Sequence, residues 1–168
     1  MKEKEIKQTK DLDALDLQIM GHLQEDASLS NLSLAEKLHI SPPTCLRRVK
    51  RLCEGGWIER QVALLNPMRL GASLGHIVSA LVEVTLDKQG AEHLDAFEAK
   101  AVADDAVQQC WRVASGPDFI LVVQALSMPA YLEVTSRLLT QDANVRNVRA
   151  FFSTKRAKFS GAVPLPKV

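Results

Sequence analysis

A cluster of guanidinium groups between residues 41 and 53 could bind phosphate and read the edges of bases. This segment holds four basic residues and no acidic ones. Arginine presents a rigid fork of donors that fits phosphate oxygens and the O6/N7 edge of guanine. A solvated helix face is the ordinary alternative for such a charge run. We predict instead that the segment contacts double-stranded DNA through Ser41, Pro43, Thr44, Arg47, Arg48 and Arg51.

These side chains share a face only if the segment is a helix, and its sequence favours one. Ser41 is a suitable N-cap, and Pro42 suits the first helical position, where no backbone donor is missed. Gly55-Gly56 is typical of a helix end. An apolar stripe recurs at spacings of three and four: Cys45, Val49, Leu52 and Cys53.

Two further helices are predicted upstream, over 12–25 with Asp11 or Asp13 as its cap, and over 31–38. Residues 39–41 then form a tight turn into the basic helix. Two helices joined by three or four residues, the second of them basic, are typical of a helix-turn-helix unit. The local charge, with a net charge of only +1 for the chain, favours a focused DNA contact over a diffuse basic coat.

The second half of the chain changes period and predicts a small α+β domain. Strands are expected over 77–86, 107–114, 118–126 and 145–153, with helices over 91–102 and 129–139. This βαββαβ order is the ferredoxin-like arrangement. Helices cover one sheet face only, so the other face needs a partner, and we expect a homodimer.

The chain resembles the leucine-responsive/asparagine-operon (Lrp/AsnC) transcription regulators over about residues 11 to 166. The matching residues keep their order and spacing: Leu12-Asp13, Asp16, Ile19, Leu34-Ala35, Ser41-Pro42, Arg48-Val49, Leu52, Gly56, Ile58, Asn66-Pro67, Leu70-Gly71, Cys110, Asp118 and Pro164-Leu165-Pro166. Within the family, residues 58–62 and the Leu-Pro ending look most like regulators of branched-chain amino-acid breakdown.

The resemblance implies a domain plan and an assembly. It comprises a flexible arm (1–10), a helix-turn-helix domain (11–57), a linker strand (58–70), a ferredoxin-like effector-binding and oligomerisation domain (71–160) and a C-terminal tail (161–168). The strand over 58–65 would pair with its twin in a second subunit, which would also protect an exposed edge. The family's C-terminal module regulates amino-acid metabolism and binds small effectors between dimers, and four dimers would form a ring-shaped octamer.

The resemblance also implies an effector site in the loop between the predicted strands over 107–114 and 118–126, at Ser115, Gly116, Pro117 and Asp118. Backbone amides of a tight turn could hold an amino-acid carboxylate, and Asp118 could hold its ammonium. The alternative is that Gly116-Pro117 only makes the hairpin and Asp118 caps it. Ser115 stands where the family has glycine, so the pocket could be narrower, altered in specificity or no longer responsive.

The sequence gives little support to catalysis, a metal site or a cofactor. Three cysteines, an odd number without metal-ligand spacing, are interpreted as small core residues in a reducing compartment, and the four histidines are scattered. No phosphate loop or nucleophile motif is present. Two alternatives stay open, a sirohaem-decarboxylase-like enzyme and an effector-sensing oligomer without DNA binding. No apolar run could cross a membrane, so a cytoplasmic location is expected.

Overall fold

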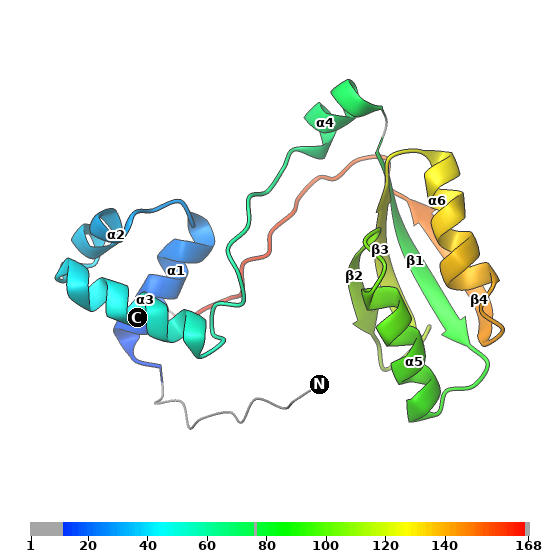
Figure 1. Cartoon of the computed structure of the whole chain (residues 1–168), viewed down its shortest axis with the longest axis horizontal. Helices are drawn as coiled ribbons and strands as arrows, with labels where there is room; N and C mark the ends of the chain where they lie inside the picture. The colour runs from blue at the N-terminus through cyan, green and yellow to red at the C-terminus, as the bar shows by residue number, and fades with distance from the viewer. Residues whose placement is uncertain (1–11, 76, 167–168) are drawn as a thin grey trace. The chain divides into compact units, whose positions relative to one another are not determined.

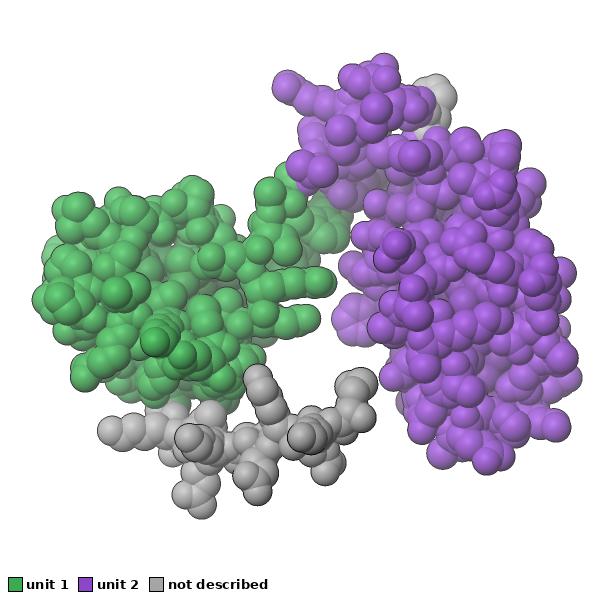
Figure 2. Space-filling model, in the orientation of Figure 1, with its two compact units in different colours: residues 1–64, 158–168 green, residues 65–157 purple. Residues whose placement is uncertain are grey.

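A computed structural model describes residues 12–75 and 77–166, so the predicted arm of residues 1–10 lies outside the described part (Figure 1). The chain divides into two compact units (Figure 2). Unit 1 comprises Met1–Leu64 with Lys158–Val168, and unit 2 comprises Leu65–Ala157. Each unit has its own core of buried hydrophobic residues.

Unit 1 contains three helices: α1 (Ala14–Glu25), α2 (Asn31–Lys37) and α3 (Pro42–Glu54). Each begins at a short polar residue whose side-chain oxygen accepts a hydrogen bond from a first-turn amide, as N-caps do; these are Asp13, Ser30 and Ser41. Their apolar stripes meet in a core that contains Ile19, Leu23, Leu34, Ala35, Cys45 and Leu52. No strand or wing is present among residues 12–64.

The connection between α2 and α3 is a tight turn, as the sequence predicts. His39 adopts a left-handed conformation with φ of 53°, which a side chain rarely favours. The Ile40 amide donates to the Ala35 carbonyl at 3.0 Å and closes the turn. At the other end of α3, Gly56 has φ of 74° and lets the chain leave the helix. The helix-turn-helix prediction is confirmed.

Unit 2 begins with α4 (Pro67–Leu74) and continues as β1 (Val78–Leu86), α5 (Ala91–Val102), β2 (Val107–Arg112), β3 (Phe119–Ala125), α6 (Met128–Thr135) with a π-helical extension (Ser136–Thr140), and β4 (Val145–Phe152). The four strands form one antiparallel sheet in the order β2-β3-β1-β4. The predicted ferredoxin-like βαββαβ arrangement is confirmed.

Both long helices of unit 2 pack on the same face of this sheet (Figure 1). Residues alternate between buried and partly exposed along β1 and β3, because successive side chains of a strand point to opposite faces. The buried set joins Phe97 of α5 and Tyr131 of α6 to one core. Within the described residues of unit 2, neither α5 nor α6 lies on the opposite face.

The segment between the units differs in part from the predicted linker strand over 58–70. Residues 67–70 belong to α4 instead, where Pro67 takes an early helical position and the Asn66 side chain accepts from the Arg69 amide at 3.2 Å. Residues 59–66 form no ladder within this single chain. Val62, Leu64 and Leu65 are exposed there. Pairing of this segment with a second subunit stays a prediction.

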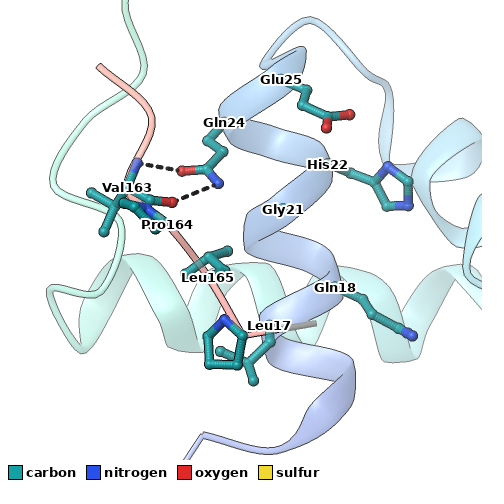
Figure 3. A pocket seen from close by; sticks show the side chains of 10 residues that line it. Leu17, Gln18, Gly21, His22, Gln24, Glu25, Val163, Pro164 and Leu165 are labelled. Atoms are coloured by element: carbon teal, nitrogen blue, oxygen red, sulfur yellow. Dashed lines mark hydrogen bonds between the residues drawn. The ribbon is translucent and has the colours of Figure 1, made fainter. Parts of the chain in front are cut away.

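The C-terminal segment returns to unit 1 and lies along α1, antiparallel to it (Figure 3). The Gln24 carboxamide forms two hydrogen bonds with Val163, accepting from its amide at 3.0 Å and donating to its carbonyl at 3.1 Å. A groove of about 400 Å³ between helix and tail is lined in part by Leu17, Gly21 and Leu165. It includes none of the residues predicted to bind DNA or effector.

Candidate nucleic-acid interface and effector site

The N-terminal half of α3 presents an exposed surface of polar and basic groups. Ser41 caps the helix, and its hydroxyl lies 2.8 Å from that of Thr44. Pro43 and Arg47 are exposed on the same side, and Arg47 forms no ion pair with the described residues. Pro42 and Pro43 have no amide hydrogen and the Thr44 amide donates to the Ser41 hydroxyl, so the helix end contributes its partial positive charge and not free amide donors. This end of α3 can therefore approach an anionic ligand.

Two residues extend this exposed surface beyond the predicted set. Leu46 and Lys50 lie on it, since they follow Pro43 at spacings of three and seven. Lys50 is largely exposed and only loosely paired with Glu54, at 3.7 Å. Leu46 is an exposed apolar side chain of the kind that contacts thymine methyl groups. We call Ser41, Pro43, Thr44, Leu46, Arg47 and Lys50 the α3 surface.

The other two arginines of α3 turn toward α1. Arg48 donates through Nη1 to Asp13 Oδ2 at 2.6 Å and to Asp16 Oδ1 at 2.9 Å. Arg51 donates through Nη2 to the second oxygen of Asp16. The side chains of Arg48 and Arg51 are 24% and 40% exposed, whereas that of Asp16 is 0% exposed. We call these four residues the Asp16 cluster.

Asp16 also forms hydrogen bonds within the first turn of its own helix, α1. Asp13 and Asp16 form a reciprocal capping box, in which the Asp13 amide donates to Asp16 Oδ2 at 3.1 Å. Burial opposes ionisation of Asp16. Hydrogen bonds from Arg51, the Asp13 amide and Arg48 outweigh that effect and lower its pKa to about 2. The carboxylate is therefore charged at neutral pH and compensated by two guanidinium groups.

The sequence of the basic segment does not predict this cluster, because the two carboxylates come from a different helix. The pattern of the isolated helix indicates a face without carboxylates. In the structure, however, Arg48 and Arg51 are both paired with carboxylates. The sequence of α1 nevertheless indicates that Asp16 needs a charged partner. Asp16 falls three and seven residues before Ile19 and Leu23, on the stripe that is buried. A charged residue on a buried stripe almost always has a partner.

The cysteines are only partly as predicted. Cys45 is buried in the unit 1 core, and burial raises the pKa of its thiol. Cys110 is partly buried in β2, where burial and then the charge of Glu98 raise its pKa. Cys53 is exposed, so its prediction as a core residue is wrong. The described residues contain no group of side chains that could hold a metal ion.

The predicted effector residues lie together in the turn between β2 and β3. Gly116 has φ of 86°, a conformation that favours glycine, and Ser115 and Gly116 are exposed. Asp118 anchors the turn: its amide donates to the Val84 carbonyl at 2.9 Å. Its Oδ2 accepts from the Leu86 amide at 2.7 Å. Gln89 donates to the same oxygen at 3.2 Å.

This geometry combines the two roles that the sequence left open for Asp118. One carboxylate oxygen is used to tie the turn to the end of β1. The other, Oδ1, accepts no hydrogen bond from the described residues, so it can receive an ammonium group. Exposed backbone at Ser115 and Gly116 lies next to it in the chain. The turn therefore combines a carboxylate oxygen that has no partner among the described residues with two exposed residues.

Comparison with known proteins agrees with both units. The family model for winged helix-turn-helix DNA-binding domains matches residues 12–59, and that for the Lrp/AsnC ligand binding domain matches residues 79–163. A leucine-responsive regulatory protein of Rhizobium meliloti is 35% identical over 148 residues, which cover 88% of this chain and 92% of the relative. The protein of the same name from Escherichia coli K12 is 32% identical over 151 residues, 90% of each chain.

Solved structures agree as well. An AsnC family transcriptional regulator from Agrobacterium tumefaciens aligns with a TM-score of 0.79 at 28% identity, covering 91% of this chain and 97% of its own. A transcriptional regulator from Neisseria meningitidis, solved as a complex with L-methionine, aligns with a TM-score of 0.79 at 27% identity over 92% and 97% of the two chains. None of the described helices is long and apolar enough to cross a membrane. These relatives are regulators and not enzymes, and the chain belongs to the Lrp/AsnC family of helix-turn-helix transcriptional regulators.

Proposed function

We propose that the protein regulates genes of amino-acid metabolism in the cytoplasm by binding double-stranded DNA through the α3 surface. The observation that carries this proposal is the exposed α3 surface, with Arg47 and Lys50 directed away from the unit 1 core. The second helix of a helix-turn-helix unit enters the major groove with its N-terminal residues toward the bases. An arginine that is not held by a carboxylate is the first candidate to reach them.

The six residues predicted to contact DNA differ in how well the structure supports that role. Ser41, Pro43, Thr44 and Arg47 belong to the α3 surface. Arg51 is 40% exposed and can touch a phosphate while it keeps its contact with Asp16. Arg48 is 24% exposed and is bound by two carboxylates, so its direct contact with DNA is the least supported of the six.

Replacing Arg47 with alanine should weaken operator binding. A bidentate contact between arginine and guanine contributes about 1–3 kcal/mol of discrimination, so the loss should be about fivefold or more. A phosphate contact would instead lower the salt slope of binding by about one and weaken all sequences equally. Fluorescence anisotropy with labelled duplexes over a range of salt concentrations measures both quantities.

Lys88→Ala is the matched control for Arg47→Ala. It removes a single exposed cation from the β1–α5 connection of unit 2 and leaves α3 intact. It should bind the operator as the wild type does. Equal operator affinity and equal salt slope in Arg47→Ala and the wild type would contradict the assignment of the α3 surface.

An amino acid or a close relative is the proposed effector, bound at Ser115, Gly116, Pro117 and Asp118 between dimers. Support comes from the free Oδ1 of Asp118 next to exposed turn backbone. The Neisseria relative was solved with L-methionine, which makes amino acids the first ligands to test. Ser115 stands where the resemblance places glycine, so its side chain would occupy space above the turn, and a narrower or altered set of ligands is expected.

Replacing Asp118 with asparagine should weaken amino-acid binding by about tenfold or more, because the ammonium loses a charged partner. Asparagine can still accept from the Leu86 amide, so the turn should keep its shape. Calorimetry with a panel of amino acids on wild type and variant measures the effect. Unchanged affinity in Asp118→Asn would place the pocket elsewhere, and no binding to the wild type would favour a regulator without an amino-acid effector.

A homodimer that assembles further to an octamer is proposed as the active form. The sheet face that carries no helix exposes an apolar cluster, and the linker exposes Val62, Leu64 and Leu65. Both need a covering partner, and a second copy of the chain supplies the same surfaces by two-fold symmetry. An effector-sensing oligomer without DNA binding remains the second candidate, since it would use the same sheet face but not the α3 surface.

A further inference from the structure

We infer that Asp16 is a positioning residue for DNA recognition: its buried carboxylate fixes Arg48 and Arg51 and thereby sets how α3 is oriented on α1. This inference rests on the proposed use of α3 as the DNA-reading helix. It gives Arg48 a role through Asp16 in place of a direct contact with DNA.

The carboxylate joins α3 to α1 at two separate points. Its Oδ1 accepts from Arg48 at 2.9 Å, and its Oδ2 accepts from Arg51. These arginines lie three residues apart, so neighbouring turns of α3 are both attached. The Asp13 amide and the Asp13 carboxylate complete the cluster at the first turn of α1. Two attachments restrain rotation of α3 about its axis as well as sliding along α1.

The apolar contacts of unit 1 cannot supply this restraint alone. The burial of Ile19 against Cys45 and Leu52 favours close packing, but the hydrophobic effect is not directional. Hydrogen bonds require defined distances and angles, so a buried charged pair can select one arrangement among several compact ones. Reading of base edges by paired hydrogen bonds depends on such an arrangement, since misplaced donors lose their acceptors.

Removing the negative charge of Asp16 tests the inference, because the alternatives predict opposite changes in operator affinity. Asp16 is an anion within the DNA-binding unit, and it is fully buried. If its charge acted only on the DNA phosphates, or only masked two arginines that could otherwise bind DNA, its removal would strengthen binding. If it positions α3, its removal should weaken binding to the operator while binding to unrelated DNA stays equal or rises.

The test compares operator with unrelated DNA in the full-length protein. Wild-type protein first selects its operator from a random pool of duplexes. Anisotropy then gives the affinities of wild type and Asp16→Asn for this operator and for a scrambled duplex of the same composition. We expect the ratio of the two affinities to fall tenfold or more in Asp16→Asn. Leu23→Ala, which destabilises the same core without touching the Asp16 cluster, should keep the wild-type ratio in its folded fraction.

A second variant keeps the test decisive if Asp16→Asn does not fold. Arg48→Gln leaves Asp16 paired with Arg51 and with the Asp13 amide. We expect it to lower the ratio while the salt slope of binding stays as in the wild type. A slope lowered by about one would identify Arg48 as a phosphate contact and overturn the inference.

An unchanged ratio in Arg48→Gln, or in a folded Asp16→Asn, would overturn the positioning role alone. Failure of the wild type to select any DNA would instead overturn the proposed function, so the two failures are distinguishable.

Discussion

Replacing Leu81 with aspartate should convert the assembled protein to monomers and lower operator affinity on the order of a hundredfold or more, because two linked recognition helices bind far more tightly than one. Leu81 lies in the middle of β1 on the sheet face that carries no helix, and it is 48% exposed. A buried, unpaired carboxylate at this point would oppose association strongly.

The register of the strands shows why this position matters. Residues directly opposite each other on neighbouring strands share a face. Leu81 is opposite Val122 on β3 and Phe151 on β4. On the neighbouring row, Ile120 is opposite Trp111. The five side chains form one apolar cluster in the centre of the open face.

The border of this cluster is polar, as in many protein interfaces. Glu83 and Arg149 form an ion pair at 3.3 Å, and the Arg149 guanidinium lies 5.3 Å from the centre of the Phe151 ring. An apolar centre with a charged border is the usual anatomy of a specific interface. Covering the centre is favoured by about 25 cal/mol for each Å² of apolar area.

Light scattering with size-exclusion chromatography measures the assembly state of Leu81→Asp. Val102→Asp is the matched control, because Val102 is 66% exposed at the end of α5, on the helical side of unit 2. The control should keep the wild-type mass and affinity. A wild type that is monomeric at micromolar concentration, or a Leu81→Asp protein of unchanged mass, would contradict the proposed dimer.

Local patterns in the sequence were sufficient to predict most of the fold. The helix predicted over 91–102 has those bounds in the structure. Gly90 is its N-cap, Ala103 is its C-cap, and apolar residues recur between them at helical spacing. Ser41 caps α3 as predicted, with its side chain accepting from the Thr44 amide. Such features depend on residues within one turn of each other, and the local sequence contains all of them.

The features that the sequence did not predict depend on other parts of the chain. The sequence analysis does not predict α4, because Pro67–Leu70 lie within the segment assigned to the linker strand. Cys53 has the spacing of a buried residue, but it lies at the end of α3, where the core of unit 1 no longer covers it. The ion pairs of Asp16 join residues 32 and 35 positions apart, which no local period encodes. The sequence therefore predicts the segment that forms the candidate site. It does not predict that Arg48 and Arg51 pair with carboxylates of α1 while Arg47 stays exposed.

Acidification should destabilise unit 1 through Asp16. The pKa of this carboxyl is lowered from 3.8 to about 2 in the folded chain. Its ionised form therefore stabilises the fold fully above about pH 4, and this stabilisation is lost as the pH falls toward 2. The shift corresponds to about 2 kcal/mol, a large part of the stability expected for a three-helix unit.

Denaturant unfolding as a function of pH measures this loss. Trp57 lies in unit 1 and Trp111 in unit 2, so a Trp111→Phe background leaves Trp57 to report on unit 1 alone. In this background, the free energy of unfolding should fall by about 2 kcal/mol more between pH 4 and pH 2 than in the same protein with Asp16→Asn. Asp26 also has a lowered pKa, because of its hydrogen bonds with Ser28, but it is present in both proteins and cancels in the difference. Equal pH dependence in the two proteins would show that the Asp16 carboxylate gains no net stability from Arg48 and Arg51.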